Sequence, residues 1–136
     1  MIKFVIRAKK NPLNRTQIKF YPQMAPGVPV MLRTILGRIE KRSGVSSASV
    51  KAVLDALQYE ILQTLADGNS VRLGDLGSFR LTMHGEGVTT AKQAKEKGAD
   101  LIKRVSVRFT KSSAMRLALD KHNLTFGAQE DIQNVK

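Results

Sequence analysis

Residues 79–84 and 104–110 of this chain alternate strictly between apolar and polar side chains. This period of two predicts half-buried β-strands. If the two strands pair antiparallel, their apolar residues face the helices and their other face is entirely polar or basic. That face would present Arg80, Thr82, His84, Arg104, Ser106 and Arg108. Such side chains suit phosphate oxygens and minor-groove edges, although an ordinary solvated sheet face is the simpler alternative.

This polar face belongs to an uneven distribution of charge. The chain has 136 residues, with 23 Lys plus Arg against 11 Asp plus Glu, and a formal net charge of +12. Residues 1–20 and 102–111 are basic and contain no acid. Surfaces of soluble proteins normally mix charges of both signs. Two acid-free clusters in a small protein therefore favour a polyanionic partner, most often nucleic acid and less often an anionic membrane.

A pair of helices is predicted ahead of these strands. Apolar residues recur at helical spacing over 32–39, after Pro29, which suits the first turn of a helix. Gly44 ends this helix, and a serine within 45–47 caps a second helix whose apolar stripe runs through 50–65. The second helix is nearly neutral outside its stripe, whereas a groove-reading helix needs basic and amide side chains. We therefore expect it to pack and dimerise.

An N-terminal hairpin is predicted from a second pair of alternating segments. Residues 2–7 have strand period, Asn11-Pro12 carries turn chemistry, and 17–21 suits a return strand. The loop between the strands is basic. Proline and glycine at 22–29 then predict a linker.

The remaining segments complete an α+β chain. We expect a short helix at 89–97 that ends at Gly98, and a last helix from Ser112 or Ser113 to about Lys121. The end of the chain has weak periodicity, and we expect it to fray. These patterns divide the chain into a hairpin and linker at 1–27, a central domain at 28–121 and a tail at 122–136.

Several classes of protein are not expected. The chain has no cysteine, which excludes disulfides, thiolate zinc sites and cysteine nucleophiles. No apolar run approaches the roughly 18 residues of a spanning helix, and the N-terminus does not resemble a signal peptide. His84 and His122 are isolated, and no catalytic or phosphate-loop motif is present. We expect neither an enzyme nor a bound cofactor, metal or small-molecule substrate.

Residues 68–79 (Gly-Asn-Ser-Val-Arg-Leu-Gly-Asp-Leu-Gly-Ser-Phe) resemble the HU and integration host factor family of bacterial histone-like proteins. Members of that family have a helix pair followed by a strand that ends in a Gly-Phe-Gly-Thr-Phe-like turn, here 75–79. The order of elements is also similar over about residues 28–121. The N-terminal hairpin, with Asn11-Pro12 and Phe20-Tyr21, is similar to a variant branch of HU-like proteins.

The resemblance implies an α+β, intertwined homodimer with a helix-turn-helix body, an antiparallel β-sheet saddle over DNA and two arms in the minor groove. The family's arm ends in an Arg-Asn-Pro-x-Thr-Gly tip, whereas this chain has 84–92 there and no proline after Pro29. We therefore do not expect an intercalated, strongly bent duplex. The residues expected to bind DNA are Arg80, Thr82, His84, Lys92, Lys95, Lys97, Lys103, Arg104, Ser106, Arg108 and Lys111.

The sequence thus predicts a histone-like protein that binds duplex DNA largely independently of sequence. We expect it to condense DNA in the cytoplasm, associated with the nucleoid, with no membrane partner. Two alternatives stay open. One is a basic RNA-binding protein, although the chain has only five Phe and two Tyr for base stacking. The other is a protein-interaction module with a degenerate arm, in which the hairpin adds a strand to a partner sheet.

Overall fold

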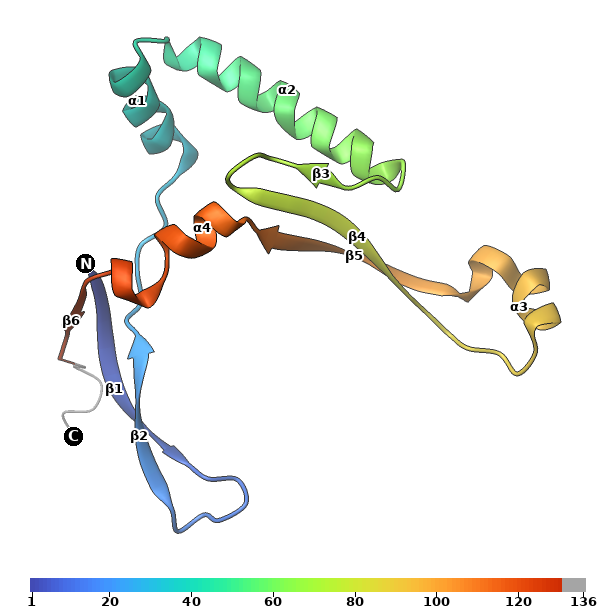
Figure 1. Cartoon of the computed structure of the whole chain (residues 1–136), viewed down its shortest axis with the longest axis horizontal. Helices are drawn as coiled ribbons and strands as arrows, with labels where there is room; N and C mark the ends of the chain where they lie inside the picture. Colours follow the sequence, from blue (N-terminus) through green and yellow to red (C-terminus); the bar gives the residue numbers. More distant parts are fainter. Residues whose placement is uncertain (131–136) are drawn as a thin grey trace. The chain divides into compact units, whose positions relative to one another are not determined.

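The computed structural model describes residues 1–130 and has a mixed α+β architecture, as the sequence predicts (Figure 1). The chain divides into two units. One combines Met1–Val30 with the segment that begins at Leu117, and the other comprises Met31–Arg116. Each unit has its own three-stranded sheet. The boundaries predicted at residues 27 and 121 remain predictions.

The N-terminal hairpin pairs β1 (Ile2–Lys10) with β2 (Ile18–Met24) in antiparallel register. The return strand therefore continues past the predicted 17–21, and the linker begins later than Pro22. The Ala25 N–H donates a hydrogen bond to the Lys3 carbonyl (2.9 Å). Because hydrogen-bonded positions alternate along an antiparallel pair, the backbone groups of odd-numbered β2 residues point toward β1. Pro22 lies at an outward position of this edge strand, where its missing N–H costs no bond to β1.

A third strand, β6 (Phe126–Ala128), lies parallel to β1 and completes the order β2-β1-β6. Its flanks are held by hydrogen bonds from Ile2 N–H to the Thr125 carbonyl (2.8 Å) and from Gln129 N–H to the Phe4 carbonyl (2.9 Å). The expectation that the tail frays is therefore wrong for 126–128, and its part at 131–136 lies outside the described residues. Because β6 is held by its pairing with β1, which is distant in the sequence, residues 126–128 need no periodic pattern of their own.

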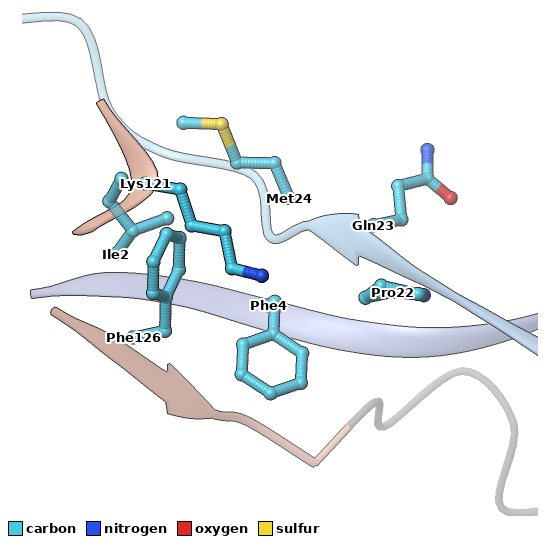
Figure 2. A pocket seen from close by; sticks show the side chains of 7 residues that line it. All are labelled: Ile2, Phe4, Pro22, Gln23, Met24, Lys121 and Phe126. Carbon is cyan, nitrogen blue, oxygen red and sulfur yellow. The ribbon is translucent and has the colours of Figure 1, made fainter. Parts of the chain in front are cut away.

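One face of this sheet is apolar and hollowed. A cavity of about 470 Å³ lies over it, and Figure 2 shows the rings of Phe4 and Phe126 together with the Lys121 side chain from η2 (Lys121–Asn123). Its lining residues are Ile2, Phe4, Pro22, Gln23, Met24, Lys121 and Phe126. By the alternation of β1 and β2, the basic side chains Lys3, Arg7, Lys9 and Lys19 belong to the opposite face.

The helix pair consists of α1 (Leu32–Ser43) and α2 (Ser47–Ala66). Gly44 ends α1 in the left-handed region (φ +73°), and the Ser46 hydroxyl accepts a hydrogen bond from the Ser49 N–H (3.2 Å) as the N-cap of α2. Both features confirm the predicted turn. Met31, not Pro29, precedes the first helical residue, so the expectation that Pro29 opens the helix is wrong. Leu36 and Leu65 are the buried side chains of the pair.

The second sheet has the order β3-β4-β5. Its strands are β3 (Val71–Arg72), β4 (Gly77–Gly85) and β5 (Ile102–Lys111), and the predicted antiparallel pairing of the two long strands is confirmed. The predicted short helix is α3 (Ala91–Lys97), capped by Thr90 and followed by a 3-10 turn, η1 (Gly98–Leu101). The last helix, α4 (Ser113–Ala118), is capped by Ser112 but is shorter than predicted.

The apolar side of the second sheet is only partly covered. The rings of Phe79 and Phe109 pack at a centroid distance of 5.1 Å, and α2 contacts β3 and β4. Farther along the strands, Met83 and Val107 are 64% and 59% exposed. The expectation that this side faces the helices is therefore wrong for much of its length within a single chain. Among the described residues, the buried apolar side chains are Val5, Ala25, Leu36 and Leu65.

Candidate nucleic-acid interface

The predicted polar face is assembled by the register of β4 and β5. Arg80 lies opposite Arg108, Thr82 opposite Ser106, and His84 opposite Arg104. Directly paired residues on antiparallel strands point to the same side of the sheet, so these six side chains form three successive rows. The four basic and imidazole side chains are exposed, and Thr82 and Ser106 are half-buried. We refer to these six residues as the polar face.

The electrostatics of the polar face favour an anion. No carboxylate lies within its three rows, and the two arginines Arg80 and Arg108 oppose each other directly. Like charges directly opposed on a sheet destabilise it. A phosphate bound between the two guanidinium groups would remove that repulsion and add charge-assisted hydrogen bonds. The Thr82 hydroxyl donates a long hydrogen bond to the Ser106 carbonyl (3.5 Å), which ties the middle row together.

Sequence reasoning missed Arg72 as a member of this surface. Arg72 pairs with Ser78 on β4, and Ser78 pairs with Thr110 on β5, which adds a further polar row beside Arg80 and Arg108. The signal was present, because Val71 and Leu73 flank Arg72 in strand alternation. The alternation does not reveal that β3, a strand of two residues, pairs with β4.

Lys111 does not lie in the polar face. It pairs with Gly77, and alternation places it on the other side of the sheet from Arg108. It instead borders a small hollow of about 150 Å³ at the end of the strands, together with Arg72. The expectation that Lys111 binds DNA stays a prediction.

Lys103 sits at an irregularity where the polar face meets the arm. The register shifts between His84 and Gly85, so Lys103 is the extra residue of a β-bulge. Its ammonium nitrogen lies 3.5 Å from a carboxylate oxygen of Glu86, and both side chains are more than half exposed. An exposed ion pair of this kind contributes little to stability, so a phosphate can compete for Lys103.

The three remaining predicted residues lie at the far end of the β4–β5 hairpin (Figure 1). Lys92, Lys95 and Lys97 are exposed side chains of α3 and do not join the polar face. The Thr90 hydroxyl caps this helix through the Gln93 N–H (3.2 Å). The arm thus ends in a short lysine-bearing helix.

Residues 1–130 contain no cluster of three His, Cys, Asp or Glu side chains that could hold a metal ion. None of their helices is long and apolar enough to cross a membrane.

A helix pair followed by a β-hairpin arm with an acid-free polar face is the architecture of an HU-like protein. The chain matches the model of the HU-HIG family, described as "HU domain fused to wHTH, Ig, or Glycine-rich motif", over residues 1–125. The chain therefore belongs to this family, and the resemblance drawn from residues 68–79 is confirmed.

Two solved structures share the fold. A Bacteroides vulgatus protein described as a "Putative bacterial DNA binding protein" superposes with a TM-score of 0.65 at 18% identity, covering 93% of this chain. The chain spans 47% of that protein's length. A point variant of HU from Thermotoga maritima superposes with a TM-score of 0.50 at 20% identity, covering 67% of this chain and 100% of HU. No curated protein sequence matches the chain.

Proposed function

We propose that this protein is a histone-like, architectural DNA-binding protein that acts without catalytic chemistry. It binds duplex DNA with little dependence on base sequence, in the bacterial nucleoid. The observation that carries the proposal is the polar face, where paired strands align basic and hydroxyl side chains without one carboxylate. Phosphate contacts of this kind position a protein on DNA but read no sequence.

A second copy of the chain is part of the proposal. Besides the uncovered side of the β-sheet, α2 exposes Val53, Tyr59 and Leu62 at 67%, 61% and 66%. Apolar surface on this scale marks an interaction site. The HU-like fold supports an intertwined homodimer in which the partner covers these side chains and the two polar faces form one saddle. Twice the formal charge of +12 then makes counterion release the dominant source of affinity.

The arm is proposed to contact phosphates without kinking the duplex. Its tip carries the lysines of α3, and no proline is present there to insert between base pairs. We therefore expect the protein to coat and condense DNA more than to bend it. If about six phosphates are contacted, log Kd against log salt concentration has a slope near 5 in magnitude.

The test is a fluorescence anisotropy titration of a labelled duplex of roughly 30 base pairs at several salt concentrations. The variant Arg104→Ala with Arg108→Ala should weaken binding at least about tenfold and lower the salt slope, since each lost phosphate contact removes about 0.9 from it. The matched control is Arg33→Ala with Arg38→Ala, two exposed arginines of α1. Both variants should melt like the parent protein.

Unchanged affinity in the folded Arg104/Arg108 variant would refute the assignment of the polar face. Competition then separates the nucleic acids. Unlabelled duplex of unrelated sequence should compete as well as the probe, whereas single-stranded RNA should compete poorly because the polar face contains no Phe, Tyr or Trp side chain for base stacking.

A further inference from the structure

The distal end of the N-terminal hairpin carries a second concentration of positive charge. We define the hairpin end as residues 9–21, the last residues of β1, the connecting loop and the first residues of β2. Its basic side chains are Lys9, Lys10, Arg15 and Lys19, and all four are exposed. No acid occurs before Glu40 in the sequence. This surface lies in a different unit of the chain from the polar face.

The register of the hairpin brings these charges together. Lys9 lies directly opposite Lys19, and the Lys9 ammonium nitrogen is 5.9 Å from the centroid of the Tyr21 ring. Lys9, Lys10 and Lys19 line one hollow of about 510 Å³, which Tyr21 also borders. Three lysines from two strands thus border a single open space.

This arrangement is unfavourable without a partner. Like charges directly opposite each other destabilise an antiparallel pair, and within residues 1–130 no carboxylate forms an ion pair with Lys9 or Lys19. The Tyr21 ring supplies only a weak cation–π contact at an exposed site. A polyanion in the hollow would remove the repulsion.

The loop that joins the strands is pre-organised. The Asn11 carboxamide oxygen accepts a hydrogen bond from the Leu13 N–H (3.0 Å), and its amide nitrogen donates to the Gln17 side chain (3.2 Å). The Asn14 carboxamide oxygen accepts from the Thr16 hydroxyl at 2.6 Å. A loop ordered by its own side chains loses less entropy when it binds.

We propose that the hairpin end is a second binding site for the phosphate backbone of duplex DNA, separate from the polar face. The proposal goes beyond the proposed function, which needs only the second sheet and its arm. Each chain then holds DNA at two places, which lengthens the contacted site or joins two duplexes.

The segregation of the hairpin's faces favours DNA over a membrane. Ile6 and Phe20, which are 50% and 70% exposed, belong to the face opposite Lys9 and Lys19. A bilayer that took up these apolar side chains would leave both ammonium groups directed away from the headgroups. A duplex requires only Lys9 and Lys19 on one face, together with Lys10, which alternates to the other face at the end of β1 but borders the same hollow.

The experiment compares three full-length proteins in the salt-dependent anisotropy titration. The hairpin variant carries Lys9→Gln, Lys10→Gln and Lys19→Gln. The control carries Lys41→Gln, Lys51→Gln and Lys121→Gln, which remove the same charge from exposed positions elsewhere. The hairpin variant should lower the magnitude of the salt slope by about 2.7 for each hairpin in contact, and weaken binding at least about tenfold near 0.1 M salt. The control should change the salt slope by less than about 0.9, the contribution of one phosphate contact.

Two results would overturn the proposal. One is a hairpin variant whose slope and affinity match those of the control. The other is a hairpin variant that binds DNA like the unmodified protein but no longer sediments with vesicles containing phosphatidylserine. The site would then bind a membrane. Melting curves of all variants verify that they are folded. The Arg104/Arg108 variant tests the two proposals separately. If that variant binds DNA as tightly as the unmodified protein, the polar face is not a DNA-binding site. Weakened binding by the hairpin variant would still support the hairpin end as one.

Discussion

Gly77 is the position where a single methyl group should do most damage. It is buried at the start of β4, within the turn that resembles the histone-like family, and its φ of +150° is one that L side chains rarely adopt. A Cβ added there would lie 2.2 Å from the Thr110 carbonyl oxygen and 2.8 Å from a ring carbon of Phe109. Ordinary van der Waals contact begins at 3.4 Å, so Gly77→Ala must displace the β5 backbone.

The cost has two parts. A residue held in a sparsely populated region of φ and ψ costs about 1–3 kcal/mol, and breaking one or two hydrogen bonds between β4 and β5 adds about 1 kcal/mol each. The Phe79–Phe109 contact should also be disturbed, since Phe109 is one of the residues that must move. We expect Gly77→Ala to lower the free energy of unfolding by about 2–5 kcal/mol, which corresponds to a fall in Tm of roughly 6–20 °C.

The assay is thermal unfolding followed by circular dichroism at one fixed protein concentration, because association would make Tm depend on concentration. Two glycines of the same unit serve as matched controls. Gly74 has a φ of +54° but open space around its Cβ position, so Gly74→Ala should cost only the conformational strain of about 1–2 kcal/mol. Gly87 has open space and no positive φ, so Gly87→Ala should change stability by less than about 0.5 kcal/mol.

We expect Tm to be lowest for Gly77→Ala, intermediate for Gly74→Ala and highest for Gly87→Ala. If Gly77→Ala melts no lower than Gly74→Ala, the close approach of β4 to Thr110 does not exist. The register that aligns the polar face would then be wrong as well, because the same pairing positions Arg80 opposite Arg108.

Two further predictions concern the helix cap and the partner chain. Ser46→Ala should destabilise the protein by about 1 kcal/mol in urea unfolding because it removes the cap on the Ser49 N–H, while Ser70→Ala, an exposed serine, should have no effect beyond about 0.5 kcal/mol. If a second chain covers Val107, which is 59% exposed, Val107→Lys should dissociate the dimer and lower the sedimentation coefficient in sedimentation velocity. Val28→Lys, at a residue that is 91% exposed, should leave the sedimentation coefficient unchanged. An unaltered sedimentation coefficient for Val107→Lys would contradict the proposed interface.

The sequence alone predicted the elements whose residues are neighbours along the chain. Alternation in 79–84 and 104–110 predicted the two long strands and their polar face, and Gly44 with Ser46 predicted the turn between the helices. These signals are local because strand period, capping and left-handed glycine conformations depend on a few adjacent residues. The family resemblance rested on one such stretch, and the family match confirms it.

Tertiary structure decided which distant segments meet. β6 pairs with β1 through backbone groups that every residue carries, so no pattern in 126–128 revealed it. Arg72 joined the polar face through the pairing of β3 with β4, which a single strand's sequence does not specify. The opposition of Lys9 and Lys19 depends in the same way on how β1 and β2 align. Alternation determines which side chains share a face of one strand, but only the paired backbone determines which side chains stand opposite each other.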